Sequence, residues 1–197
     1  MSISAKQVKE LKDKTGIGLM ECKKAVKETE GDLEEAINVL RKRGLAKAEK
    51  KSGRDVKEGR IHSYIHPGGK IGVLVEINCE TDFVAKNEKF KEFTKNIAMH
   101  IAASDPIAVD REDMDPKLVE KEKEIFTEQA KSENKPEKII PRIVEGKINK
   151  FYQQSCLLEQ EYVKNPDISV QEYIKQTIAR IGENISVSRF TRYKLGE

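Results

Sequence analysis

The segment from Asn78 to Asn87 places an acidic side chain directly beside an aromatic ring, at Asp82 and Phe83. It follows a predicted strand and precedes a predicted helix, and loops in such positions present side chains from a rigid support. If both side chains project outward, the ring can wedge between packed elements of another protein while the carboxylate competes there for cations or hydrogen bonds. Alternatively, Phe83 belongs to the core and Thr81 or Asp82 caps the next helix, and the residue types alone favour this second interpretation.

Other residues with chemical potential do not form a recognisable active site. No His or Asn signature of a cysteine nucleophile surrounds Cys79, so a buried structural Cys is favoured over a small enzyme using this thiol. The Gly-Gly-Lys sequence at residues 68–70 precedes a strand, whereas a phosphate-binding loop precedes a helix. His62 and His66 would lie about 13 Å apart on one strand face, too far for one metal ion. We therefore expect no enzyme, no metal and no cofactor.

Residues 41–60 form the most basic stretch of the chain, with nine Lys or Arg and three acidic residues. Such a stretch can contact nucleic-acid phosphates, and an RNA- or ribosome-associated module using Lys47, Lys50 and Lys51 is the main rival function. No aromatic residue interleaves the stretch to stack on bases. A solvated, Lys-rich linker is therefore favoured, and we expect no direct binding to nucleic acid.

The composition limits the class of protein. Of 197 residues, 37% are hydrophobic and 36% are charged, so we expect a modest core with small modules or exposed helices around it. The three cysteines, Cys22, Cys79 and Cys156, are too few and too far apart for a disulfide framework, which suits a reducing cytosol. Neither an apolar run of membrane-spanning length nor a secretory signal occurs. We expect a cytoplasmic protein with no membrane partner.

Three short helices are predicted before residue 45. The first begins with a capping box at residues 4–7 and ends at the glycine-containing turn of residues 15–18. Gly31 stops the second, and the third ends with Gly44 at its C′ position, followed by a basic linker at residues 45–59. Asp32 is the predicted N-cap of the third helix. The candidate buried positions are Val8, Leu11, Met20, Cys22, Ala25, Val26, Leu33, Ala36, Ile37 and Leu40.

A change from helical to alternating periodicity marks a β-hairpin. Residues 61–65 and 71–77 alternate around a turn at residues 67–70. A helix over residues 87–103 follows, and residues 185–195 form the last strand. Three strands covered by helices give an antiparallel sheet in an α+β fold. The side chains on the buried face of the helix are Phe90, Phe93, Ile97 and Ile101, and Asn87 is its N-cap.

A charged helical hairpin is predicted between the second strand and the third. An Asp-Pro pair opens a helix over residues 116–133, and a second helix covers residues 136–153. A joint this short makes the two helices antiparallel. Pro141 falls inside the second helix, where it removes a backbone donor and can bend the helix. A capping box at residues 169–172 then opens a helix that Gly182 ends.

Two long motifs resemble those of a known family. Thr81-Asp-Phe-Val-Ala-Lys-Asn87 and Leu11-Lys-Asp-Lys-Thr-Gly-Ile-Gly-Leu-Met-Glu-Cys-Lys-Lys-Ala25 resemble the signatures of the elongation factor Ts family. Further matching segments follow in the family's order at residues 97–104, 143–147, 181–184 and 189–197. The resemblance covers essentially the whole chain and is to the short bacterial form, which has one α/β core unit where the longer form has two.

The resemblance implies a fold that agrees with these patterns. Residues 1–54 would form a three-helix, ubiquitin-associated-like (UBA-like) module with its basic linker. Residues 55–197 would form an α+β core and dimerisation domain, with a three-stranded antiparallel sheet and helices. An antiparallel coiled-coil hairpin at about residues 115–152 would interrupt that core. Short-form members are expected to be homodimers, in which two chains supply a two-unit core.

The resemblance also implies guanine-nucleotide exchange on elongation factor Tu during translation elongation. By position, Thr81, Asp82, Phe83 and Val84 match the segment that the family inserts beside the magnesium site of its partner. Phe83 would be the wedge, and Asp82 would make polar contacts that displace partner elements. The magnesium and phosphate contacts then weaken, and GDP leaves.

The N-terminal module would supply a second contact with elongation factor Tu, on a helix of the partner's GTPase domain. By position the residues involved are Lys12, Leu19, Met20 and Lys23. Lys12 and Leu19 stand where the family pattern has Arg and Met, and Lys keeps the charge of Arg without its bidentate geometry. Met20 is equally compatible with a core position beside the turn.

Overall fold

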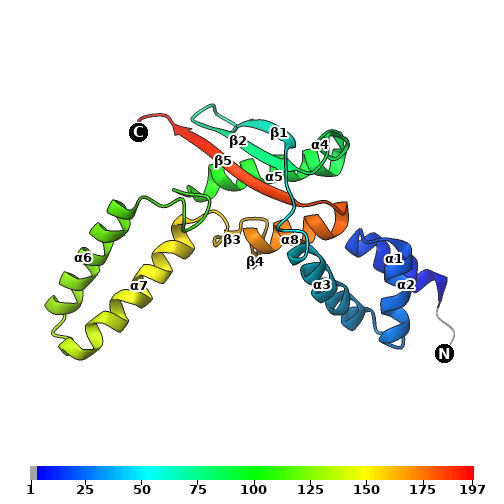
Figure 1. The fold of residues 1–197 in the computed structure, drawn as a ribbon, viewed down its shortest axis with the longest axis horizontal. Coiled ribbons are helices and arrows are strands. Elements are labelled where there is room, and N and C mark those ends of the chain that lie inside the picture. The colour runs from blue at the N-terminus through cyan, green and yellow to red at the C-terminus, as the bar shows by residue number, and fades with distance from the viewer. Residues whose placement is uncertain (1–3) are drawn as a thin grey trace. The chain divides into compact units, whose positions relative to one another are not determined.

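The structure is a computed structural model that describes residues 4–197, so residues 1–3 of the predicted N-terminal module lie outside it (Figure 1). The chain divides into two compact units. The first unit contains the chain up to Ile61, together with Glu76–Thr94 and Glu172–Ser186. The second contains His62–Val75, Lys95–Gln171 and Val187–Glu197. The described residues form an α+β fold, as predicted.

The N-terminal part of the first unit consists of three helices, α1 (Ala5–Thr15), α2 (Leu19–Glu28) and α3 (Leu33–Glu49). Ser4 and Gln7 form the predicted capping box, and the Asp32 carboxylate accepts two backbone N–H bonds from the first turn of α3. Gly16 ends α1 with φ 67°, a conformation that glycine adopts without strain. That these helices are a UBA-like module stays a prediction. Their buried core is Val8, Leu11, Cys22, Ala25, Val26, Ala36 and Leu40, all predicted from helical spacing.

Two predictions for this region are wrong. Helix α3 continues past Gly44 to Glu49, so the first part of the predicted linker at residues 45–49 is helical. A Cβ built on the buried Gly44 would lie 3.0 Å from the Cβ of Ala179, so this glycine permits close packing of α3 and does not end it. Met20 does not lie in the core, because its side chain is 65% exposed.

The central sheet contains β1 (Glu58–Ile65), β2 (Ile71–Cys79) and β5 (Ile185–Lys194) in the order β1-β2-β5. The predicted hairpin turn joins β1 to β2, and the backbone N–H of His66 donates to the carbonyl of Ile71. The alternation predicted for β2 is confirmed, since Val73, Val75, Ile77 and Cys79 are buried.

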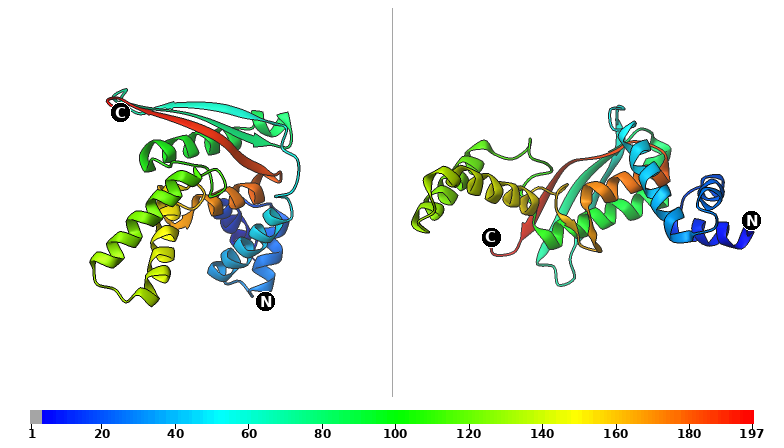
Figure 2. Two further views of the ribbon diagram at one scale, coloured as in Figure 1. Left: turned by 60° about the vertical axis from the view of Figure 1, so that its left-hand side comes forward. Right: turned by 90° about the horizontal axis from the view of Figure 1, so that it is seen from below.

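Two helices, α5 (Glu88–Ser104) and α8 (Val170–Ile181), run along one face of the sheet (Figures 1 and 2). The α5 side chains predicted to face the core are buried, and Asn87 caps the helix by accepting the backbone N–H of Lys89 at 2.8 Å. The ring of Phe93 lies 5.3 Å from that of Tyr173 on α8. Gly182, with φ 94°, ends α8 as predicted.

In the second unit, α6 (Pro116–Ser132) and α7 (Ile140–Ser155) run side by side in opposite directions (Figures 1 and 2). Lys147 of α7 donates a 2.9 Å hydrogen bond to Gln129 of α6. The prediction that Pro141 lies inside the second helix is wrong, because a short 3-10 helix (Glu137–Ile139) precedes α7. Pro141 therefore occupies the first turn of α7, where no intrahelical hydrogen bond is lost. Coiled-coil packing of the pair stays a prediction.

Three small elements were not predicted. Strands β3 (Glu161–Tyr162) and β4 (Asn165–Ser169) pair antiparallel in the second unit and are too short to show a periodic pattern. The five-residue helix α4 (Asp82–Lys86) lies between β2 and α5.

His100 of α5 is buried in the second unit. The neutral ring fits its two contacts: Nδ1 accepts the backbone N–H of Val163 at 3.2 Å, and Nε2 donates to Oε1 of Gln160 at 2.9 Å. Burial lowers the pKa of His100 below its ordinary value, and the hydrogen bond with Gln160 partly opposes that shift. The structure therefore places His100 in the core.

Candidate functional site

The Asp-Phe pair lies on α4, directly after the buried end of β2. Thr81 is the N-cap, and its hydroxyl accepts the backbone N–H of Val84 at 3.4 Å. Val84 is buried beneath the turn, whereas the side chain of Phe83 is 82% exposed. The alternative interpretation is thus right about the cap and wrong about the ring, which is not part of the core.

Asp82 is exposed beside Phe83 and pairs with Lys86 one helical turn later, at 2.7 Å. This hydrogen bond, reinforced by the charge of Lys86, lowers the pKa of Asp82 below its ordinary value. Solvent screens an exposed pair of this kind, so the pair is weak. The carboxylate is therefore ionised at neutral pH and can exchange Lys86 for another cation or donor at little cost.

A carboxylate far along the chain holds the N-cap residue. Glu183 accepts the backbone N–H of Thr81 at 3.0 Å and the Thr81 hydroxyl at 2.7 Å, across a sequence separation of 102 residues. Both carboxylate oxygens are used, so the backbone and the side chain of Thr81 are fixed together. All three groups belong to the first unit.

The residues beside this contact are also held. The backbone N–H of the buried Asn184 donates to Glu80 at 2.6 Å, and its side-chain amide donates to the carbonyls of Ser52 and Arg54 at 3.3 and 2.9 Å. Arg54 also pairs with Glu80. The Asn184 hydrogen bond, followed by the charge of Arg54, lowers the pKa of Glu80.

The residues matched in the N-terminal module are all exposed around the turn between α1 and α2. Lys12 lies near the end of α1, and Leu19, Met20 and Lys23 lie in the first half of α2. Leu19 and Met20 are 52% and 65% exposed. Two adjacent apolar side chains flanked by two lysines form a surface suited to an amphipathic helix of a partner.

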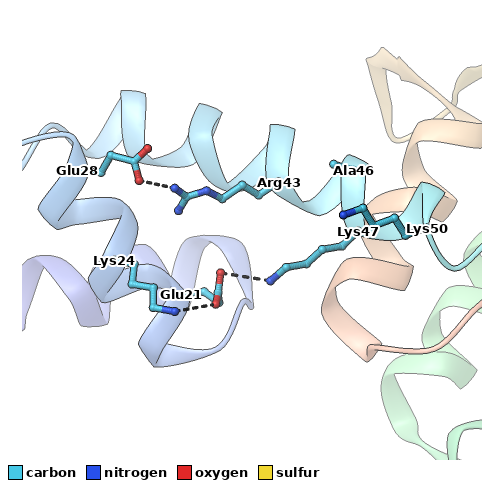
Figure 3. A pocket seen from close by; sticks show the side chains of 7 residues that line it. All are labelled: Glu21, Lys24, Glu28, Arg43, Ala46, Lys47 and Lys50. Carbon is cyan, nitrogen blue, oxygen red and sulfur yellow. Dashed lines mark hydrogen bonds and ion pairs between the residues drawn. The ribbon is translucent and has the colours of Figure 1, made fainter.

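Most cations of the basic stretch are engaged within the first unit. The groove between α2 and α3 shows this directly, since Glu21 faces Lys47 and Glu28 faces Arg43 across it (Figure 3). The hydrogen bond from Lys47 lowers the pKa of Glu21. The remaining partners are Arg41 with Glu172, Lys51 with the Gly182 carbonyl, Arg54 with Glu80 and Lys57 with Asp55. Most of these contacts tie helices or loops of the unit to one another, which gives the cations a structural role within the chain.

Cys79 is buried at the end of β2, where its thiol donates to the carbonyl of Thr81 at 3.2 Å. Burial, followed by the nearby charge of Glu183, raises the pKa of Cys79 to about 11. A thiol of this kind is a poor nucleophile at neutral pH. Among residues 4–197, no group of three or more His, Cys, Asp or Glu side chains could hold a metal ion. Within the same range, no helix has the length and apolar character needed to cross a membrane.

The described residues thus define an α+β protein that presents an exposed aromatic side chain on a tightly held turn. The family profile described as Elongation factor TS matches residues 1–197. Proteins named elongation factor Ts from Alkaliphilus oremlandii and Geotalea daltonii are each 60% identical over 197 residues, covering 100% of this chain and 91% of theirs. The protein of that name from Desulfosudis oleivorans is 53% identical over 196 residues, covering 100% of this chain and 99% of its own. The chain belongs to the elongation factor Ts family.

Sequence reasoning missed the residues that hold the turn. Glu183 and Asn184 lie in one of the segments that resemble the family, residues 181–184, but nothing in their types indicates that they meet Thr81 and Glu80. The available signal was that a polar Glu-Asn pair lies directly between a predicted helix end and a predicted strand.

Proposed function

We propose that this protein is a guanine-nucleotide exchange factor that binds elongation factor Tu in the cytoplasm and promotes release of GDP during translation elongation. The exposed ring of Phe83 carries the proposal. An aromatic side chain that is 82% exposed on a braced turn has no role in the core of the chain, and aromatic side chains are the residues most often found as binding hot spots. Family membership supplies the partner.

In this mechanism, the Phe83 ring inserts beside the magnesium site of the partner, and Asp82 engages polar groups there. Thr81 and Val84 support the turn. Thr81 is its N-cap, and the buried side chain of Val84 anchors it in the core. The magnesium and phosphate contacts of the partner weaken, and GDP leaves. Binding couplings are reciprocal, so GDP weakens binding of this protein by the same factor.

Magnitudes favour two contact surfaces acting together. Moving a two-state equilibrium from 1:99 to 99:1 needs about 5.5 kcal/mol of differential affinity. The fully exposed Asp82 charge is screened by solvent and cannot supply that alone, whereas a buried aromatic hot spot supplies about 2 kcal/mol or more. The exposed residues Lys12, Leu19, Met20 and Lys23 of the N-terminal module are therefore proposed as the second surface.

We also propose that the protein is a homodimer. In the second unit, Ile65 and Leu74 lie on the sheet face opposite the buried residues of β2, and Tyr193 of β5 is 72% exposed. A Cβ built on Gly72 would lie 3.1 Å from the side chain of Ile65, so Ile65 projects over Gly72 on this face. Exposed apolar side chains on one sheet face, as at Ile65 and Leu74, are typical of an interface, and homo-oligomers are the commonest oligomers.

The test of the exchange function is the release of labelled GDP from elongation factor Tu when this protein is added. Phe83→Ala should slow the stimulated release about 30-fold, which corresponds to the loss of about 2 kcal/mol of hot-spot energy. The matched control is Ile107→Ala, which truncates another exposed apolar side chain and should leave release unchanged. Equal stimulation by the Phe83→Ala variant and the parent protein would show that the ring is not the wedge.

A further inference from the structure

The loop between α8 and β5 contacts Thr81, the N-cap residue of the Asp-Phe turn, through Glu183. Helix α4 has five residues, far fewer than the roughly 12–15 that an isolated helix needs to be even marginally stable in water. Its conformation must therefore be imposed by neighbouring groups. Two of those groups are the Thr81 cap and the buried Val84, and a third is the carboxylate that holds the cap.

The hydrogen bonds form a directed chain from Glu183 to the turn. Because the Thr81 hydroxyl donates its proton to one oxygen of Glu183, its lone pairs remain free to accept the backbone N–H of Val84. The second carboxylate oxygen accepts the Thr81 N–H. The Thr81 carbonyl in turn accepts the N–H of Ala85 at 3.2 Å. The carboxylate is therefore connected, through Thr81 alone, to two backbone N–H groups of α4.

The loop that carries this carboxylate is itself anchored within the first unit. The backbone N–H of Asn184 donates to Glu80, and its side-chain amide donates to the carbonyls of Ser52 and Arg54. Lys51 donates to the carbonyl of Gly182, on the other side of Glu183. The carboxylate therefore reaches Thr81 from a backbone that is held at both neighbouring residues.

We propose that Glu183 is a positioning residue for the exchange reaction, which holds Thr81 so that the free protein already presents Phe83 in its binding conformation. The inference rests on the proposed function of Phe83 and adds a residue that does not itself touch the partner. Preorganisation of this kind raises apparent affinity, because only the fraction of molecules in the competent conformation binds. Asn184 supports the same role by fixing the loop that carries the carboxylate.

The first test measures stimulated GDP release from elongation factor Tu over a range of concentrations of the whole protein. Glu183→Ala should raise the half-saturating concentration about tenfold while the maximal rate stays within about twofold, because the bound partner can still impose the turn. A tenfold change corresponds to about 1.4 kcal/mol, which is close to the value of one hydrogen bond to a charged group. An unchanged half-saturating concentration would overturn the proposal.

The matched control is Glu172→Ala, which removes another carboxylate of the first unit, one that pairs with the distant Arg41. It should leave the half-saturating concentration unchanged. Glu183→Gln keeps one acceptor oxygen and should give a smaller increase than Glu183→Ala. If Glu183→Ala does not fold, Glu183→Gln takes its place, and a value equal to that of the parent protein would contradict the proposal.

A double-mutant cycle separates positioning from general stability. If Glu183 acts only through presentation of the ring, Glu183→Ala should have no further effect on GDP release in a Phe83→Ala background. Independent effects that simply add would show that Glu183 acts elsewhere, and would overturn the positioning role.

Amide hydrogen exchange of the free protein tests the contact without any partner. In Glu183→Ala, the amides of Thr81 and Val84 should exchange at least about tenfold faster, while the amide of the buried Ile77 keeps its protection. Unchanged exchange at both amides would overturn the proposal. If Phe83→Ala leaves GDP release unaffected, the proposed function of the ring fails, whereas the hydrogen-exchange result still decides whether Glu183 holds the turn.

Discussion

Gly59 of β1 offers a sharp test of how tightly the strand that leads into the Asp-Phe turn is held. A Cβ built on Gly59 would lie 2.4 Å from the carbonyl oxygen of Ile77 and 2.7 Å from the Cα of Asn78. Both neighbours are backbone atoms of β2, so no side-chain rotation can relieve the contact. Gly59→Ala therefore requires the two strands to separate locally by about 1 Å, if carbon contacts are to reach about 3.5 Å.

The magnitude follows from that separation. Overpacking of this kind costs about 1–3 kcal/mol, and a strand shift of about 1 Å also weakens adjacent ladder hydrogen bonds, each worth about 0.5–1.5 kcal/mol. We expect a total loss of about 3 kcal/mol in the free energy of unfolding. For a chain of this size, that loss lowers Tm by about 6–12 °C.

The assay is thermal unfolding followed by circular dichroism, with Gly146→Ala as the matched control. Gly146 lies within α7, and nothing stands within 4 Å of a Cβ built on it, so that alanine should be neutral or stabilising by up to about 1 kcal/mol. A Tm for Gly59→Ala within about 2 °C of that of the parent protein would refute the argument from backbone contact.

Two further predictions concern the second unit. Because burial lowers the pKa of His100 in the folded chain, the unfolded chain binds more protons than the folded chain at pH values between the folded-state pKa and about 6.5. The free energy of unfolding should therefore fall as the pH decreases through that window. Urea titrations at several pH values measure this free energy, and its dependence on pH should be weaker in His100→Gln than in the parent protein. An equal dependence on pH in the two proteins would contradict this. For the proposed dimer, sedimentation equilibrium should give twice the mass of 22.4 kDa. Tyr193→Asp should shift the protein toward monomer, whereas Ile107→Asp should not, and a monomeric parent protein would exclude the dimer.

Local signals predicted most of the helices and strands. The capping box at Ser4, the N-cap Asp32 and the Asp-Pro pair before α6 each act within a few residues, so their effect can be read from the sequence. The alternation in β2 likewise depends only on which face is buried. Gly44 shows the limit of such reasoning, because a glycine that ends a helix and one that admits a neighbouring element look the same in sequence.

The candidate site was predictable only in part. The Asp-Phe pair could be singled out from its residue types and its place between a strand and a helix. Its support could not, since the bond between Thr81 and Glu183 joins residues 102 positions apart, and no periodicity reports such a pairing. The exposure of Met20 also depends on the packing of three helices together, which helical spacing alone does not determine.

The long sequence separation between Thr81 and Glu183 has a consequence for biosynthesis. A ribosome adds the Glu183 carboxylate 102 residues after Thr81, when the Asp-Phe segment has long been completed. Domains fold as units during synthesis, and contacts between distant residues are slow to form. A nascent chain that ends before the α8–β5 loop therefore exposes the Phe83 ring on an unsupported segment. If Glu183 positions the turn as proposed, the ring acquires its binding conformation only after the loop between α8 and β5 has been synthesised.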